Sequence, residues 1–214
     1  MSIVQVFVTD DRALIGVDTE AQRLDLDIGF YEAPKLYALP HINAVLTGRG
    51  SVFFMSTLFS IICNCKVDFE ELKAKLKDLA TITFDQVTKN LTQYGVTDHS
   101  LFVAQSAVLV GWWPKLGGFH GVEVDQTNLN DGFQTLNVGQ RYIKPGHFIL
   151  DQFPTPTAPE AMAKIAAAQV DLIRHQYPNA AAGGRFIVAE LTREGMSIRE
   201  ASKFPARTAA PGII

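Results

Sequence analysis

Short apolar runs broken by turn residues dominate the first fifty positions of the chain. Their mixture of alternating and continuous apolar positions is typical of β-strands. A polar cluster at residues 9–12 separates the first two runs and predicts a hairpin close to the N-terminus. A carboxylate-rich polar stretch, residues 20–32, separates this hairpin from two further runs. The predicted strands are residues 3–8, 13–18, 35–39 and 42–47.

Two helices are predicted after this first group of strands. Glycines at positions 48 and 50 interrupt the strand pattern, and Ser51 can cap an apolar helix that runs toward Cys63. Asp68 can cap a second helix with one apolar and one charged face. The apolar face is formed by residues at helical spacing: Phe69, Leu72, Leu76 and Leu79.

Strands are expected to return after the helices. Residues 100–113 are rich in Val, Leu, Phe and Trp, and residues 119–124 again favour a strand. A turn at residues 114–118 lies between them and residues 125–132 form a polar tip. This region therefore predicts a second hairpin.

The last part of the chain predicts one helix and one strand. Thr157 and Glu160 have the spacing of a capping box, so a helix is expected to start there and to run to His175. Residues 186–191 predict the strand. The segment from about 197 to 214 is expected to be a C-terminal tail.

This order of elements predicts an α+β fold. We expect a four-layer α-β-β-α sandwich, in which two mainly antiparallel sheets pack face to face and helices cover the outside. A parallel doubly wound sheet fits less well, because the strands come as hairpins. With 214 residues, 47% of them hydrophobic and 19% charged, the chain is expected to form a single domain over residues 1–214.

Charge and composition exclude several function classes. The net charge of −3 and the lack of a basic stripe argue against a nucleic-acid partner. The longest apolar candidate, residues 52–63, is too short to span a membrane, so no membrane partner is expected. Cys63 and Cys65 do not form a disulfide framework and no export signal is visible, which favours the cytoplasm. The histidines show no ligand spacing, and we expect neither a metal nor a cofactor.

Ser2 is the first candidate for chemistry. If Met1 is removed, the Ser2 hydroxyl lies beside a free α-amine, whose ordinary pKa is about 7.7–8.0. The neutral amine can take the hydroxyl proton, so a single residue supplies both nucleophile and base. Taken singly, Ser2 can also be an ordinary polar residue near a terminus, Asp18 can form an Asx turn, and Lys35 can be a solvated lysine at a strand edge.

Together with Gly48, these residues resemble the site of the proteasome-type N-terminal-nucleophile hydrolases. In that family a nucleophile begins the first strand, an Asp closes the second, a Lys starts the third, and a Gly follows the fourth. Asp18 stands sixteen residues after Ser2, as in the family, and Lys35 requires a one-residue insertion. The resemblance extends over nearly the whole chain, including the glycine-ended strand at residues 108–112.

The resemblance implies an amide or peptide hydrolase with Ser2, Asp18, Lys35 and Gly48 as its catalytic residues. Lys35 would lower the pKa of the nucleophile, Asp18 would orient Lys35, and the N–H of Gly48 would stabilise the oxyanion. The substrate would be a peptide or another amide. The residues expected to bind it are Ala33, Leu46 and Arg49. The family also implies a homo-oligomer, as a ring or a stacked assembly.

Three positions depart from the family pattern. Asn179 and Ala182 replace an acidic and a hydroxyl residue, and Gln140 replaces a serine. These departures favour the alternative hypothesis, a catalytically inactive proteasome-like protein with a structural role in assembly. The two hypotheses differ in the first residue of the mature chain, because only a chain that begins at Ser2 has the required amine.

Overall fold

The computed structural model describes residues 2–22, 30–95, 105–126, 132–145 and 153–206. Two five-stranded antiparallel sheets form its centre. The first sheet has the order β10-β1-β2-β11-β12 and contains β1 (Val4–Val8), β2 (Arg12–Asp18), β10 (Arg141–Lys144), β11 (Arg185–Thr192) and β12 (Gly195–Lys203). The second has the order β5-β6-β7-β8-β9 and contains β5 (Leu36–Leu39), β6 (Ala44–Arg49), β7 (Ser106–Trp113), β8 (Gly118–Asp125) and β9 (Gln134–Val138).

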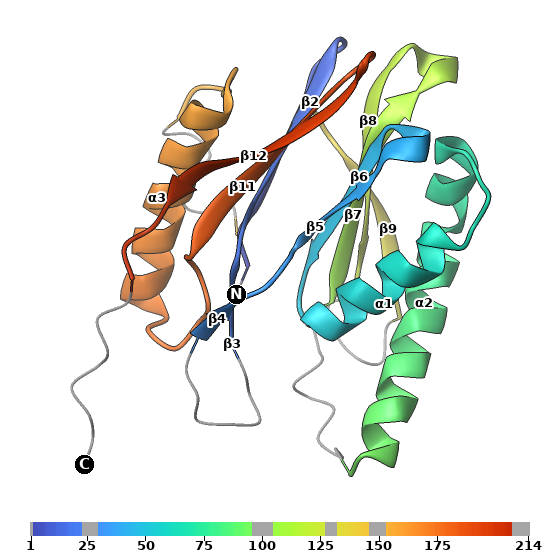
Figure 1. Ribbon diagram of the computed structural model, residues 1–214, viewed down its shortest axis with the longest axis horizontal. Helices are drawn as coiled ribbons and strands as arrows, with labels where there is room; N and C mark the ends of the chain where they lie inside the picture. Colours follow the sequence, from blue (N-terminus) through green and yellow to red (C-terminus); the bar gives the residue numbers. More distant parts are fainter. Residues whose placement is uncertain (1, 23–29, 96–104, 127–131, 146–152, 207–214) are drawn as a thin grey trace.

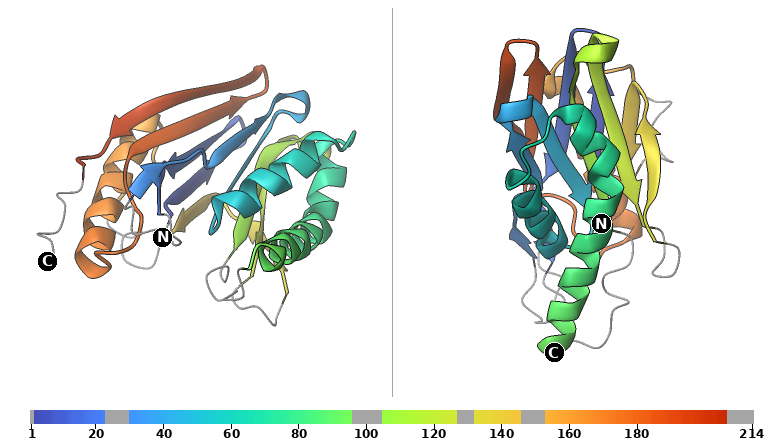
Figure 2. Two further views of the ribbon diagram at one scale, coloured as in Figure 1. Left: turned by 60° about the horizontal axis from the view of Figure 1, so that its bottom comes forward. Right: turned by 90° about the vertical axis from the view of Figure 1, so that its right-hand side faces the viewer.

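Three helices cover the outer faces of the sheets (Figure 1). Helices α1 (Val52–Cys63) and α2 (Phe69–Gln93) lie on the second sheet, and α3 (Pro159–Gln176) lies on the first. Figure 2 shows the resulting order of layers, with α3 on one side of the two sheets and α1 and α2 on the other. The predicted four-layer α-β-β-α sandwich is therefore confirmed. Among the described residues, no helix is both long and apolar enough to cross a bilayer.

Three apolar clusters hold the layers together. One lies between the first sheet and α3, and another between the second sheet and the pair α1 and α2. The third joins the inner faces of the sheets, where Val4 and Ile15 pack against Val45 and Val108. Successive strand residues point to opposite faces, so each strand contributes alternately to the inner cluster and to an outer one. This explains why the strands are apolar on both faces.

Side-chain caps fix where α1 and α2 begin. The Ser51 hydroxyl accepts a hydrogen bond from the Phe53 N–H at 3.2 Å, and the Asp68 carboxylate accepts one from the Glu71 N–H at 2.8 Å. Both caps were predicted, and both satisfy N–H groups that have no partner within the helix. Gly50, with a φ of 106°, provides the turn that leads from β6 into α1.

The start of α3 differs from the prediction. Ala158 is the residue that caps the helix and Pro159 opens it, and no side chain among the described residues bonds the cap. Glu160 instead forms an ion pair with Arg199 of β12 at 3.2 Å. The capping box expected from Thr157 and Glu160 is therefore wrong, because the helix begins one residue later and the cap position falls on Ala158, which has no side-chain acceptor.

Two segments form strands that the sequence did not predict. The segment expected to be a tail from about residue 197 is wrong over 197–203, because these residues belong to β12 and pair with β11. The polar stretch at 20–32 contains a two-stranded ladder of β3 (Glu20–Gln22) and β4 (Phe30–Glu32). Both segments are too polar to be recognised as strands by their pattern, and neighbouring backbone provides the pairing.

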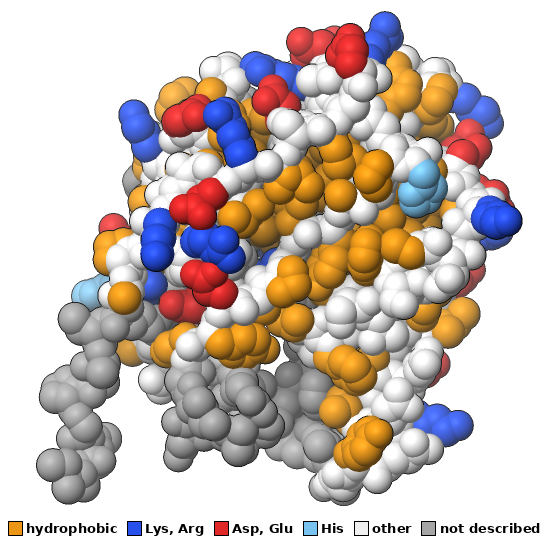
Figure 3. All heavy atoms as spheres, in the orientation of Figure 1, with side chains coloured by type: hydrophobic (Ala, Val, Ile, Leu, Met, Phe, Trp, Pro, Cys, Tyr) orange, Lys and Arg blue, Asp and Glu red, His pale blue; other side chains and the backbone are white. Residues whose placement is uncertain are grey.

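One face of the molecule combines apolar and charged surface. Figure 3 shows apolar side chains gathered along the edges of the two sheets, where β12 and β5 lie. Phe53 and Ile198 are among the large apolar side chains that remain exposed, at 47% and 45%. Charged side chains lie beside this apolar surface, including Arg185, which pairs with Glu32 and Glu200.

Candidate active site

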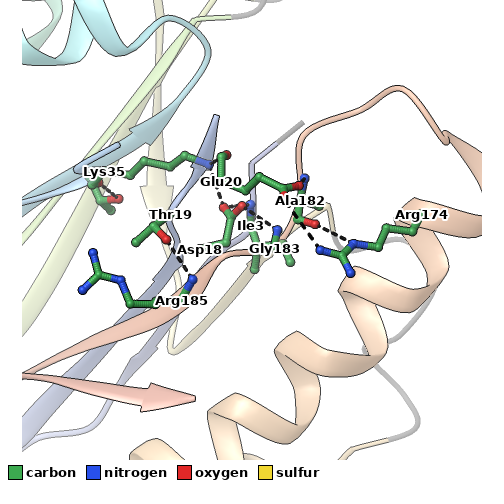
Figure 4. A network of polar contacts seen from close by, with 10 residues as sticks. Ile3, Asp18, Thr19, Glu20, Lys35, Arg174, Ala182, Gly183 and Arg185 are labelled. Carbon is green, nitrogen blue, oxygen red and sulfur yellow. Dashed lines mark hydrogen bonds and ion pairs between the residues drawn. The ribbon is translucent and has the colours of Figure 1, made fainter. Parts of the chain in front are cut away.

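Asp18 is the centre of a buried polar network at the end of β2 (Figure 4). Its side chain has no exposed surface. Carboxylate oxygen Oδ1 accepts hydrogen bonds from the Ile3 N–H at 2.9 Å and from Lys35 Nζ at 3.0 Å, and Oδ2 accepts one from the Gly183 N–H at 3.1 Å. A buried carboxylate requires such partners. Asp18 therefore connects the start of β1, the lysine before β5 and the segment before β11.

Lys35 is held both at its ammonium group and at its backbone. The side chain is 7% exposed and forms a buried ion pair with Asp18. Its Nζ also donates to the carbonyl of Glu20, and its own carbonyl accepts a hydrogen bond from Thr47 Oγ1 at 2.7 Å. These contacts fix the ammonium group in the interior. Lys35 is therefore not the solvated lysine at a strand edge that the sequence allowed as an alternative.

Ser2 lies beside this pair because β1 pairs with β2. Val4 is opposite Val17, and the ladder continues with the Asp18 N–H donating to the Ile3 carbonyl at 3.4 Å. Ser2 is the residue before Ile3, whose N–H bonds Asp18, and Ser2 is 9% exposed. The hydrogen-bond pattern thus brings the neighbourhood of Ser2 together with Asp18 and Lys35.

Gly48 lies on the neighbouring strand. Leu36 pairs with Thr47, so continuing the antiparallel register by one residue sets Gly48 opposite Lys35. A Cβ atom at position 48 would lie 2.0 Å from the carbonyl oxygen of Ser106 and 2.7 Å from Met55 Sδ. Packing alone therefore requires glycine here. This requirement accounts for the residue whether or not its N–H takes part in chemistry.

The three expected substrate-binding residues occupy different environments. Ala33 is buried beside the network, where its N–H donates to the Thr19 carbonyl at 2.8 Å. Leu46 is fully buried in the cluster beneath α1 and α2, on the outer side of the second sheet. Arg49 is half-buried, and its Nε is enclosed without a hydrogen-bond partner among the described residues.

A second polar group lies near Arg49, between the two sheets. Tyr142 of β10 donates to the buried Glu123 carboxylate of β8 at 2.5 Å, and Lys144 pairs with the same carboxylate at 3.4 Å. Burial raises the pKa of the Tyr142 phenol well above its usual range, and the negative charge of Glu123 adds to this effect. The positive charge of Arg49 partly opposes it. No local pattern in the sequence indicates this group.

The sequence also missed the residues behind Asp18. Glu20 Oε2 accepts a hydrogen bond from the Ala182 N–H at 2.9 Å, and Glu20 Oε1 lies 3.5 Å from the Arg174 guanidinium. Arg174 in turn donates to the Ala182 carbonyl at 3.0 Å. More than 150 positions separate Glu20 from both Arg174 and Ala182 in the sequence, so no local pattern could have linked them. The one available signal was the spacing of Asp18 and Glu20.

Comparison with known proteins identifies the fold at this point. No family model matches the sequence, and none of the curated proteins does. Among solved structures, the chain is similar to a variant of Anbu, the Gly-1 mutant, from Hyphomicrobium sp. strain MC1. The TM-score is 0.62 at 13% sequence identity, and the match covers 94% of this chain and 88% of Anbu. The chain thus shares the fold of Anbu, and this fold is the four-layer α-β-β-α sandwich that its sequence predicted.

Proposed function

We propose that the chain is an N-terminal-nucleophile hydrolase that cleaves peptide or other amide bonds, with Ser2 as nucleophile after removal of Met1. The observation that carries this proposal is the pair of bonds made by Asp18 Oδ1. One comes from the N–H directly after Ser2, and the other comes from the buried Lys35 ammonium. These two bonds support the proposal, because they hold the residue after Ser2 and the Lys35 ammonium on one carboxylate, in a fold shared with Anbu.

The proposed reaction has two steps. The Ser2 hydroxyl attacks the substrate carbonyl while the neutral α-amine of Ser2 takes its proton, and this proton passes to the amine that leaves as the C–N bond breaks. Water then attacks the resulting ester and gives a proton to the same α-amine, which passes it to the Ser2 oxygen as the ester C–O bond breaks, so that the acid product leaves and Ser2 is restored. One amide and one water are consumed for one acid and one amine.

The remaining residues would stabilise charge in this sequence. The Lys35 ammonium, fixed by Asp18, favours the developing alkoxide of Ser2 because opposite charges attract strongly at a buried site. The backbone N–H of Gly48 is the proposed oxyanion donor, and its position opposite Lys35 supports this assignment. Ala33 and Arg49 remain the proposed contacts for the substrate. Leu46 lies beneath α1 and α2, so it would act only indirectly, by shaping the sheet surface behind the bound substrate.

The proposal includes self-association. We infer a homo-oligomer, as a ring or a stacked assembly, because a proteasome-like fold is built for such packing and because Phe53 leaves a large apolar side chain exposed at the start of α1. Size-exclusion chromatography with light scattering tests this. A monomer at all concentrations would contradict this part of the proposal and would leave the chemistry of Ser2 untouched.

The second candidate is an inactive protein that keeps the fold for assembly. The observation in its favour is Ala182, which is fully buried behind Asp18 and carries no hydroxyl group to handle a proton there. Under this hypothesis the Asp18–Lys35 pair is purely structural. The two candidates differ in the state and the reactivity of Ser2.

The test uses the full-length protein, produced from its natural coding sequence. Intact mass and N-terminal sequencing establish whether the chain begins at Ser2, and a peptide-like electrophile that forms an adduct with hydroxyl nucleophiles then probes its reactivity. We expect one adduct per chain, located at residue 2 and absent from Ser2→Ala. Ser60→Ala, which alters an exposed serine of α1, is the matched control and should label normally. Retention of Met1, or a labelling rate unaffected by Ser2→Ala, would refute the hydrolase.

A further inference from the structure

We propose that Glu20 is a positioning residue for the Asp18–Lys35 pair, acting with Arg174 as its counter-ion. This inference rests on the proposed function of that pair. Glu20 is 7% exposed and opens β3, immediately beyond the end of β2. Figure 4 shows its carboxylate directed away from Lys35, toward the segment that carries Ala182 and Gly183.

Glu20 contacts the pair through its backbone. Its carbonyl accepts a hydrogen bond from the Lys35 ammonium, which also donates to Asp18. The position of the Lys35 Nζ atom therefore depends on where this carbonyl lies. The Glu20 N–H donates to the Gly183 carbonyl at 3.1 Å, so the peptide groups on both sides of the Glu20 α-carbon are fixed.

Glu20 contacts the opposite segment through its side chain. Two successive N–H groups of that segment donate hydrogen bonds to two different carboxylates. The Ala182 N–H donates to Glu20 at 2.9 Å, and the Gly183 N–H donates to Asp18 at 3.1 Å. The carboxylate that orients Lys35 and the carboxylate that pairs with Arg174 are thus joined by two successive peptide groups that share the Ala182 α-carbon. A shift of either carboxylate must displace this backbone or break one of the two hydrogen bonds.

Arg174 completes the arrangement from α3. Its guanidinium lies 3.5 Å from Glu20 Oε1 and donates to the carbonyls of Ala182 and Pro205. The positive charges of Arg174 and Lys35 balance the negative charges of Glu20 and Asp18, which removes the large penalty of an unpaired buried charge.

The segment packs directly on this ion pair. A Cβ atom at Gly183 would lie 2.2 Å from Arg174 Nη2 and 3.1 Å from Glu20 Oε1. The segment that carries Gly183 therefore has no space to move toward the ion pair of Glu20 and Arg174. Loss of this ion pair would release the segment. Glu20 thereby holds the backbone that in turn holds Asp18, in a region where the sequence lacks the acidic and hydroxyl residues of its family.

The test compares Glu20→Gln with Glu32→Gln in the full-length protein. Glutamine keeps the size of the side chain and removes its charge. Glu32 lies opposite Glu20 in the β3–β4 ladder, and its own ion pair with Arg185 is 42% to 45% exposed, so it serves as the matched control. The readouts are the binding constant and the maximal rate for labelling of Ser2 by the electrophile, together with amide hydrogen exchange at Ala182 and Gly183.

We expect Glu20→Gln to lower the maximal labelling rate by about tenfold or more with little change in the binding constant, because a small misplacement of a reacting group is costly to rate. Exchange at Ala182 should accelerate by about tenfold, because the uncharged side chain holds its N–H less firmly, and exchange at Gly183 should rise with it as the adjoining bond to Asp18 loosens. Glu32→Gln should change neither. If Glu20→Gln folds poorly, the double variant Glu20→Gln/Arg174→Gln removes both charges together, and it should also label slowly.

Three outcomes overturn the inference. The first is wild-type labelling kinetics in Glu20→Gln or in the double variant. The second is a change confined to the binding constant, which would assign Glu20 to substrate binding. In both cases the wild-type protein still labels at Ser2, so the proposed function stands. The third is a wild-type protein that begins at Ser2 and labels no faster than Ser2→Ala, in which case the proposed function fails and the positioning role fails with it.

Discussion

The buried ion pair of Lys35 and Asp18 gives the sharpest test of the structure. Replacing Lys35 with methionine keeps most of the side-chain volume and removes the only cation that contacts Asp18 in the described residues. The two side chains are 7% and 0% exposed, so water cannot solvate the carboxylate that remains. Removing one partner of such a pair costs about 3–5 kcal/mol.

This cost should be visible in thermal unfolding. For a domain of this size, 1 kcal/mol corresponds to a shift of about 2–4 °C in Tm, so Lys35→Met should lower Tm by about 6–20 °C. Lys115→Met is the control, because Lys115 pairs with Glu70 at the surface and its side chain is 69% exposed. Such a surface pair contributes about 0–1 kcal/mol.

A double-mutant cycle distinguishes the pair from its surroundings. Lys35→Met, Asp18→Asn and the double variant are compared by urea unfolding, followed by circular dichroism. We expect the double variant to be more stable than the sum of the two single losses implies, with a coupling energy of about 1–3 kcal/mol. A loss below about 1 kcal/mol for Lys35→Met, or additivity within about 0.5 kcal/mol, would show that the ammonium group is not buried against Asp18.

Two further predictions concern the strands around the site. Gly48→Ala should destabilise the fold by about 3 kcal/mol in urea unfolding, because the new Cβ meets the rigid carbonyl of Ser106. Gly139→Ala is the control and should change the free energy of unfolding by no more than about 0.5 kcal/mol, since the space around Gly139 is open. Equal effects of the two variants would contradict the pairing of β6 with β7. Because the pKa of Tyr142 is raised in the folded state by burial and by Glu123, its contribution to stability is complete below the ordinary value of 10.0 and is lost as the pH rises above it. Ultraviolet titration near pH 10 should therefore show equal numbers of ionising phenols in the wild-type protein and in Tyr142→Phe. One phenol fewer in Tyr142→Phe would show that Tyr142 ionises with the exposed phenols and would refute its burial.

The structure explains which elements could be predicted from the sequence. The caps at Ser51 and Asp68 were predictable because the groups that form them lie within three residues of each other along the chain. The polar strand β12 was not predictable, because its pairing partner β11 supplies the hydrogen bonds that its own composition does not suggest. The start of α3 shows the same limit, because the cap falls on Ala158 and Glu160 pairs with Arg199, a partner distant in the sequence.

For the candidate site, the sequence by itself determined the order of elements and the linked spacings of Ser2, Asp18, Lys35 and Gly48. Those spacings follow from strand lengths and turns, which are local properties. Only the tertiary structure decided that Lys35 is buried on Asp18 and that Glu20 and Arg174 support the segment behind it. These contacts join strands and a helix far apart in the chain, and the balance of charge in a buried site depends on which groups the fold brings together.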